Sequence, residues 1–288
     1  MSLLIGNGVN RISNSVSWET LLRSLWVARP DRLELEYLNN KPFGLLYEEI
    51  VLSGVTPEQI FNETATKHRI AGQMRLLTPN DFDRRIMTCG VQHVLTTNYD
   101  YSLENSSGMN FEKDNLKREN KYSIFRRRTF RETCIWHLHG ECDVPQTITL
   151  GYDQYCGYVQ KLRMYATAER NGQHGSPFKR GIVDFDRSDD VHSWLDVFLR
   201  DDIHIIGLSL DFTEIDLWWA LTYKARLNAR GWKTGKTYFH DWYEKQHEEP
   251  TLAKLSLLTA LGVQVRSIHC LEGYEAQYDK FIRTELRN

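Results

Sequence analysis

The chain has 288 residues, with 41% hydrophobic and 26% charged side chains, which is the composition of a globular protein of one large or two small domains. A formal net charge of −2 argues against a general binder of nucleic acids or membrane surfaces, and no apolar run reaches the roughly 18 residues of a membrane helix. The start of the chain lacks the pattern of a signal peptide, and the five scattered cysteines form no CxxC pair. We therefore expect a cytoplasmic, reduced protein that holds no metal.

A short apolar strand opens the chain and runs directly into a glycine-rich turn. Leu3 to Ile5 are followed by Gly6, Asn7, Gly8, Val9 and Asn10. Two glycines let the backbone turn sharply and approach a ligand, and a helix that starts there favours an anion. A plain turn is the alternative interpretation.

Helical patterns fill the next part of the chain. Helical spacing is visible over 18–25 and 42–52, and Thr56-Pro57 and Thr78-Pro79 both have the form of a helix start. Gly90 ends the last of these helices. We predict that residues 14–90 form a helical insertion between the first two strands of a sheet.

The second strand, Val91 to Leu95, ends in a polar cluster, Thr96-Thr97-Asn98-Tyr99-Asp100. Ligands of open α/β sheets bind outside the carboxyl ends of the strands, so Thr97, Asn98 and Asp100 are candidate site residues. The alternative is a turn in which Asn98 and Asp100 bind local backbone and cap the next helix. For Asp100 both interpretations stay open.

A third strand, Thr133 to Leu138, ends in His139-Gly140. His137 and His139 alternate along it and must face opposite sides of the sheet, so we expect His137 to be packed and His139 to face the site. An imidazole titrates near neutral pH and suits a general base. Before this strand we expect a loop over 105–121 and an edge strand or hairpin within 122–131.

The rest of the chain alternates strands and helices. We expect strands at 147–150, 204–208, 237–239 and 263–268, helices at 192–199, 213–229, 251–261 and 274–286, a further helix ending near Glu169, and a lid or partner-facing loop over 171–190. Asp153 is expected to be structural, and Trp218 and Trp219 to belong to the core or an interface. This alternation predicts an α/β fold, a Rossmann-like, mostly parallel six-stranded sheet with helices on both faces, in a single domain over 1–288.

Four polar strand ends therefore meet at one edge of the predicted sheet. Their sequences, GNGVN at 6–10, TTNYD at 96–100, LHG at 138–140 and GLSL at 207–210, resemble the pattern of the sirtuin-like superfamily in order and spacing over roughly residues 1–270. Asn10 stands where that family usually has Ser. The zinc module of the protein-deacylating members, with its two CxxC pairs, has no counterpart here. The chain is thus more similar to the bacterial branch that cleaves NAD, much of it associated with defence against bacteriophage.

The resemblance implies an NAD hydrolase, with NAD as substrate and no metal. Cleavage of the nicotinamide–ribose bond passes through an oxocarbenium-like transition state and releases a neutral pyridine, so the leaving group needs no acid. Backbone amides at 6–9, with Ser209, would bind the pyrophosphate, and the adenosine would lie near His240, Asp241 and Ser267. The catalytic residues are then Asn98 and His139, and the cofactor-binding residues are Gly6, Asn7, Gly8, Asn10, Thr97, Asp100, Gly207, Ser209 and Asp241.

Two other functions use the same residues. An ADP-ribosyltransferase would break the same bond and pass ADP-ribose to a macromolecular acceptor. A catalytically silent subunit would bind NAD or ADP-ribose as a sensor. Because constant NAD depletion is toxic, we expect an enzyme of this kind to be a gated effector of antiviral defence by abortive infection, controlled by homo-oligomerisation or by a separate sensor subunit, with no direct contact to nucleic acid or membrane.

Overall fold

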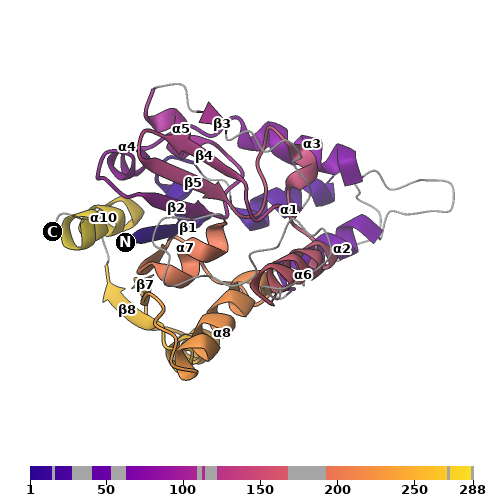
Figure 1. Ribbon diagram of the computed structural model, residues 1–288. Helices are drawn as coiled ribbons and strands as arrows, with labels where there is room; N and C mark the ends of the chain where they lie inside the picture. The colour runs from indigo at the N-terminus through magenta and orange to yellow at the C-terminus, as the bar shows by residue number, and fades with distance from the viewer. Residues whose placement is uncertain are drawn as a thin grey trace.

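The computed structural model describes residues 1–14, 17–27, 41–52, 63–108, 112–113, 122–167, 193–270 and 273–286. Within these ranges one sheet has eight strands in the order β3-β4-β5-β2-β1-β6-β7-β8 (Figure 1). The strands are β1 (Ser2–Ile5), β2 (His93–Thr96), β3 (Glu112–Lys113), β4 (Arg127–Phe130), β5 (Thr133–His137), β6 (Ile203–Ile206), β7 (Thr237–Tyr243) and β8 (Gln264–His269).

The predicted α/β fold with a mostly parallel sheet is confirmed. From β5 to β8 the six neighbouring strands are parallel, and they correspond to six of the predicted strands. The strand count of the prediction was too low, because β3 and β4 add an antiparallel edge beside β5. β4 lies within the segment predicted as an edge strand or hairpin, whereas β3 lies within the predicted loop.

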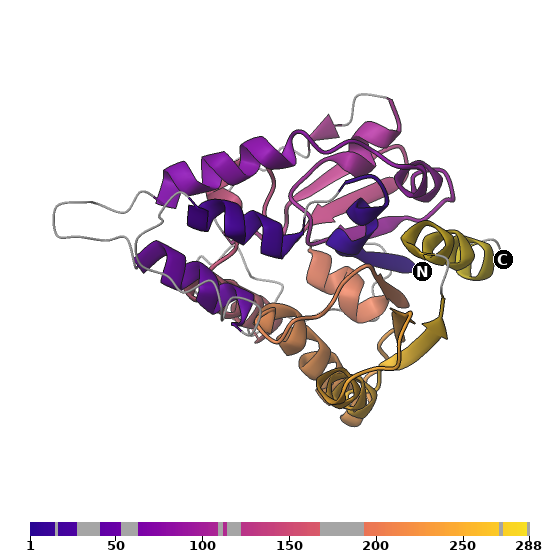
Figure 2. The same ribbon diagram turned by 180° about the vertical axis from the view of Figure 1, so that it is seen from behind.

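Helices cover both faces of the sheet, as Figure 2 shows from behind. The α-helices are α1 (Trp18–Val27), α2 (Phe43–Leu52), α3 (Glu63–Met74), α4 (Asp81–Ile86), α5 (Ser102–Ser106), α6 (Tyr152–Thr167), α7 (Trp194–Arg200), α8 (Ile215–Ala229), α9 (Glu249–Ala260) and α10 (Gly273–Phe281). The short 3₁₀ helices η1 (Asn7–Ile12) and η3 (Pro145–Thr147) and the π-helical turn η4 (Ile282–Leu286) complete the described elements.

Alternate residues of β1 enter the two cores on opposite faces of the sheet, as the strand period of two requires. Leu4 packs with residues of α6, α7 and α8, whereas Leu3 and Ile5 pack with residues of α4, α5 and α10. All three side chains are fully buried, which explains why the strand is continuously apolar. The sheet is therefore the middle layer of three.

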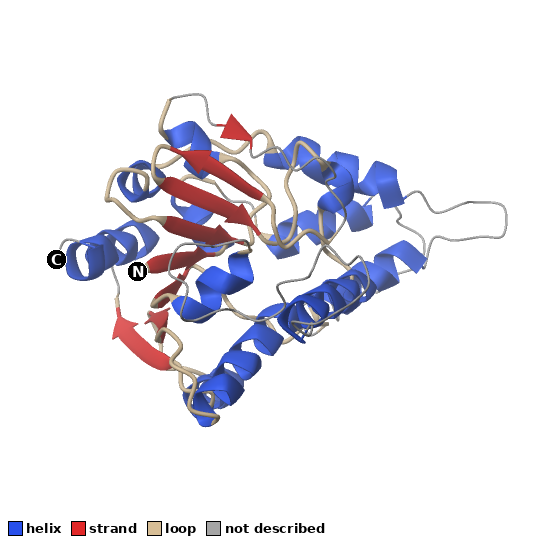
Figure 3. Cartoon of the chain, viewed as in Figure 1, coloured by secondary structure: helices blue, strands red, loops and turns tan. Residues whose placement is uncertain are grey.

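A third apolar cluster joins α1, α2 and α3 to the segments that follow β2 and β5. Residues outside these helices also belong to the cluster, among them Tyr99, Ile148 and Leu150. In Figure 3 the arrowheads of β2 and β5 point toward this group of helices. Helices α1 to α4 follow β1 and precede β2 in the chain. The assignment of one domain with an insertion over 14–90 stays a prediction.

Two local predictions were wrong. Residues 147–150 form no strand: Pro145 starts the 3₁₀ turn, and the amide of Thr149 donates to the carbonyl of His139 at 2.8 Å. The helix expected to start at Thr78 starts instead at Asp81, where Asn80 and Asp83 form a reciprocal capping box. The helix start at Thr56, most of the loop over 105–121, and the loop over 171–190 lie outside the described residues.

Candidate active site

An open cavity of about 300 Å³ lies at the carboxyl edge of the sheet, where β1 and β6 meet. The chain runs outward from β1 through β2 to β5, then returns to β6 on the other side of β1, so this is the point where the strand order reverses. Open α/β sheets bind ligands at such a point. Five of the predicted binding residues line the cavity: Asn7, Gly8, Gly207, Ser209 and Asp241.

The two glycine turns that form the floor of this cavity are in direct contact. The amide of Gly8 donates to the carbonyl oxygen of Gly207 at 2.7 Å, and a Cβ on Gly8 would lie 2.7 Å from the same oxygen. A Cβ on Gly6 would lie 2.6 Å from it, and Gly207 itself has φ +62. The glycines are thus required by close packing of backbone on backbone. The amides of Gly6 and Gly8 already donate to Ile206 and Gly207, so the proposed role of the 6–9 amides in binding pyrophosphate stays a prediction.

Asn10 and Asp100 link the turn after β1 to the turn after β2. The Asn10 side-chain amide donates to Asp100 Oδ2 at 2.9 Å and to Asn7 Oδ1 at 3.0 Å. Asp100 Oδ1 accepts the amide of Ser102 at 2.9 Å at the start of α5. The two interpretations of Asp100 are therefore compatible, because one carboxylate oxygen accepts the first amide of α5 while the other bonds Asn10 in the glycine turn.

Asn98 borders a second, much smaller cavity, which Asn7 and Asp100 also line. Its side chain is 8% exposed, and its Nδ2 makes a long contact of 3.4 Å to the carbonyl of Gly6. The buried Oδ1 has no hydrogen-bond partner among the described residues. Leaving such an acceptor unpaired costs about 1–3 kcal/mol, which a ligand hydroxyl or water would recover. Thr97, by contrast, continues the sheet by donating its amide to Ile5.

The structure does not bring His139 into either cavity as the described residues define them. Its side chain is buried and its Nε2 lies 2.8 Å from Asp216 Oδ2 on α8. Its ring packs edge-on against Tyr155, with ring centroids 5.2 Å apart, and Tyr155 lines the large cavity. Burial lowers the pKa of His139, but the carboxylates of Asp216 and Glu214 outweigh this, and the pKa is raised.

His137 is packed, as expected, and it also contacts the site. Its Nδ1 lies 3.0 Å from the backbone carbonyl oxygen of Asn98 and its Nε2 lies 2.7 Å from Glu104 on α5. Asp241 also has partners: its Oδ2 lies 2.8 Å from Ser267 Oγ and 2.6 Å from His247 Nε2. Asp241 and Ser267, both expected near an adenosine, are thus hydrogen-bonded to each other. His240, expected there as well, lines the large cavity together with Asp241.

Charged side chains that the sequence did not reveal also line the large cavity. Arg11 comes directly after Asn10 at the end of the glycine turn. A cation next to such a turn is a sequence signal that could have been used to predict its place at the cavity. Lys254 on α9 donates to the carbonyl of Ser209 at 2.7 Å, and burial lowers its pKa. Glu214 precedes α8, and its pKa is raised to about 7. Burial is the main cause; His139 lowers the pKa and Asp216 raises it further. Nothing in the local sequence marks Lys254 or Glu214.

Comparison with known families gives a match over part of the chain. Residues 92–180 match the family model described as the SIR2-like domain. This match is consistent with the sirtuin-like superfamily that the sequence motifs resemble. The matched residues include Asn98, Asp100 and His139, whereas the glycine turns at 6–8 and 207–209 lie outside them. The family includes NAD-dependent enzymes. No curated protein matches the chain.

Among the described residues, no three His, Cys, Asp or Glu side chains gather as a metal site would require. The expectation that this protein works without a metal stays a prediction. None of the described helices is long and apolar enough to cross a membrane.

Proposed function

We propose that this SIR2-like protein is an NAD hydrolase that cleaves the nicotinamide–ribose bond and releases nicotinamide and ADP-ribose, or a cyclised form of it. The observation that carries the proposal is the unpaired, buried Oδ1 of Asn98 beside the glycine turns at the switch point of the sheet. A hydroxyl of the nicotinamide ribose, or the attacking water, supplies the missing hydrogen bond. The family match, which covers Asn98, supports NAD as the substrate.

The described side chains divide naturally between the parts of a dinucleotide. Arg11 and Lys254 are cations at the cavity and suit the pyrophosphate. Asp241, Ser267 and His240 suit the adenosine, and Asn98 with Asp100 suits the nicotinamide ribose. As the C–N bond breaks, its electron pair stays on the nicotinamide nitrogen and water adds to the ribose carbon. A base must then take one proton from that water.

We propose His139 as that base, acting after Tyr155 has moved. In the present structure Tyr155 packs against the His139 ring and lines the cavity. A resting site with its base covered suits a protein whose constant activity would deplete NAD, and this supports a gated effector of antiviral defence. A cytoplasmic location and control by a second copy or a sensor subunit remain part of the same proposal.

A catalytically silent NAD or ADP-ribose sensor is the second candidate, and the burial of His139 favours it. An ADP-ribosyltransferase would differ only in the acceptor, so a label on the adenylate would move onto a macromolecule.

The test is a nicotinamide-release assay on the full chain, with Asn98→Ala and His139→Ala as variants. Loss of a general base lowers the rate about 10²–10⁴-fold. Wild-type release of nicotinamide with both variants impaired supports the hydrolase. NAD binding without release, under conditions that include a candidate activator, supports the sensor, and near-wild-type turnover in both variants contradicts the proposed site.

A further inference from the structure

A buried histidine and glutamate stand directly behind Asn98, outside both cavities. The side chains of His137 on β5 and Glu104 on α5 are fully buried, with Nε2 and Oε1 2.7 Å apart. His137 Nδ1 lies 3.0 Å from the backbone carbonyl oxygen of Asn98. These contacts join β5, α5 and the turn after β2, three elements that are separate in sequence and neighbours in the fold (Figure 1).

The chemistry of the two contacts fixes the protons on the ring. A carbonyl oxygen only accepts, so Nδ1 must carry a proton and donate it to Asn98. Nε2 faces a carboxylate, and one proton must lie between them. Imidazole is intrinsically more basic than a carboxylate, which favours placing that proton on the ring. His137 is then an imidazolium, held by Glu104 on one side and holding Asn98 on the other.

Charged groups from neighbouring elements surround this pair. Arg128 on β4 lies 3.1 Å from Glu141 and also donates to the hydroxyl of Tyr101. The Tyr101 ring packs edge-on against the His137 ring, and Arg126 donates to the His137 carbonyl at 3.2 Å. Burial opposes the charge on His137, but Glu104 and Glu141 outweigh it and raise its pKa.

The contacts of Asn98 show what the pair does. Both backbone groups of Asn98 are hydrogen-bonded. Its amide donates to Thr96 Oγ1 at 3.0 Å, and its carbonyl oxygen lies 3.0 Å from His137 Nδ1. These two contacts fix the backbone of Asn98, and its side chain lies beside the small cavity with Nδ2 3.4 Å from the Gly6 carbonyl oxygen. The backbone from which the unpaired Oδ1 projects is therefore positioned before any ligand arrives.

We propose that His137, fixed by Glu104, is a positioning residue for Asn98: its Nδ1–H holds the Asn98 carbonyl so that the Asn98 amide meets the ribose or the attacking water in a productive orientation. This inference rests on the proposed function in assigning Asn98 to NAD cleavage. The contact itself and the proton on Nδ1 are independent of it.

Two substitutions of His137 separate its two contacts. An Asn amide nitrogen occupies about the position of Nδ1, and a Gln amide nitrogen occupies about that of Nε2. His137→Gln therefore keeps the contact to Glu104 and loses the one to Asn98. His137→Asn, combined with Glu104→Gln so that no buried carboxylate is left unpaired, keeps the contact to Asn98 and loses the other.

In a steady-state NAD cleavage assay, His137→Gln lowers kcat about 10–100-fold, with KM changed less than about threefold, because misplacing a reacting group by about 1 Å costs up to about 10²-fold. The double variant His137→Asn/Glu104→Gln recovers kcat to within about fivefold of wild type. Unchanged kcat in His137→Gln, or equal losses in both variants, overturns the proposal.

Tyr165→Phe is the control for a loss of stability alone. It removes a buried hydrogen bond of 2.7 Å to Asp196 between α6 and α7, so Tm falls while kcat stays at the wild-type value. A fall in kcat that follows Tm across all these variants overturns the proposal.

Nitrogen NMR of histidine-labelled protein provides a readout that needs no turnover. The expected spectrum shows both ring nitrogens of His137 protonated at neutral pH, with the Nδ1 proton slow to exchange. A deprotonated Nδ1 overturns the positioning contact. If wild-type protein releases no nicotinamide, the proposed hydrolase fails, and the Nδ1 resonance alone decides whether His137 holds Asn98.

Discussion

Asn10 and Asp100, which are far apart in the chain, are joined by a buried hydrogen bond of 2.9 Å. This bond ties the turn after β1 to the turn after β2, while the second oxygen of Asp100 accepts the amide of Ser102 at the start of α5. The same carboxylate thus contributes both to stability and to the shape of the site.

Asp100→Ala should lower the free energy of unfolding by about 1–3 kcal/mol, because it removes the acceptor of the first amide of α5 and leaves the buried Asn10 amide with only its bond to Asn7. Asn10→Ala should cost less, because Asp100 keeps its bond to Ser102. A double-mutant cycle in urea should give a coupling energy of about 1 kcal/mol or more. Additive effects of the two substitutions would mean that the bond contributes nothing.

Gly8→Ala should unfold the protein at lower temperature and abolish NAD binding, because its Cβ would lie 2.7 Å from the Gly207 carbonyl oxygen. Gly72→Ala is the matched control: it lies in α3, and its Cβ would meet nothing within 4 Å. That substitution should raise stability by about 0.5–1 kcal/mol, since Gly is a poor helix former. Thermal unfolding and NAD titration of both variants measure the difference.

Asp216→Asn should shift the acidic limb of the pH–rate profile of NAD cleavage to lower pH. Asp216 raises the pKa of His139, and a base works only when it is unprotonated. Without the carboxylate the imidazole loses its proton at lower pH, so activity extends further into the acid range. The measurement is nicotinamide release from pH 5 to 8, and an unmoved limb would assign the base to another group.

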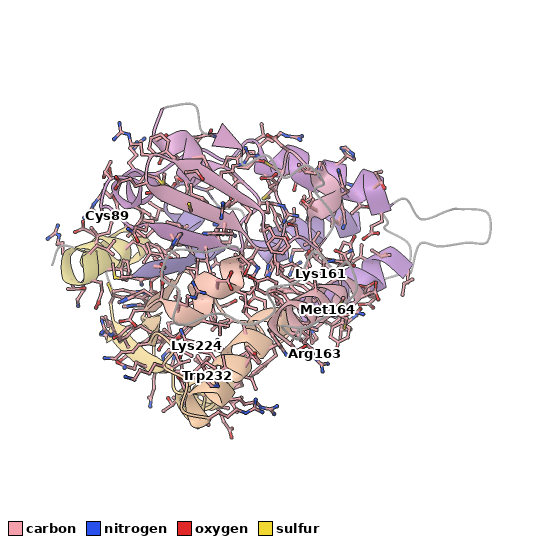
Figure 4. The ribbon with its side chains drawn as sticks, in the orientation of Figure 1. Cys89, Lys161, Arg163, Met164, Lys224 and Trp232 are labelled. Carbon is pink, nitrogen blue, oxygen red and sulfur yellow. The ribbon has the colours of Figure 1, made fainter. Side chains whose placement is uncertain are left out.

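Lys224 should make stability depend on pH in the alkaline range. It is buried on α8, with Nζ 2.7 Å from the carbonyl of Phe198 on α7, and burial lowers its pKa to about 7 (Figure 4). Between about pH 7 and the unfolded value of 10.5 the unfolded chain binds the extra proton, so stability rises with pH.

Lys224→Met should remove this rise in denaturant titrations over the same range. Arg163→Met is the control: Arg163 is exposed on α6, also labelled in Figure 4, and its removal should leave the slope unchanged. A persistent slope in Lys224→Met would show that another group causes it.

The six parallel strands could be predicted because β1, β2 and β6 contain short apolar runs that end in glycine or polar residues, and because β5, β7 and β8 are short segments rich in β-branched and aromatic residues between helices or turns. The same reasoning wrongly predicted a strand at residues 147–150. Its Thr-Ile-Thr-Leu pattern suits a strand, but Pro145 and the hydrogen bond from Thr149 to the His139 carbonyl turn it away from the sheet. Local preference was overruled by a tertiary contact.

The site could be predicted only as far as each strand end carries its own signal. The sequence placed Asn98, Asp100 and the glycine turns at one edge of the sheet. It could not show that His139 is covered, because Tyr155 and Asp216 come from α6 and α8, distant in sequence. Lys254 likewise reaches the cavity only through the packing of α9.

The peptide contact between Gly8 and Gly207 has a consequence for how a substrate would enter. It joins the turn after β1 directly to the turn after β6 at the base of the cavity, with no side chain between the two backbones. The floor of the cavity is therefore rigid. Space for an incoming dinucleotide must come from movement at the rim of the cavity, where Tyr155 on α6 and Lys254 on α9 belong to separate helices. If activity is gated, as proposed above, the activator should act on Tyr155 or α9 at that rim.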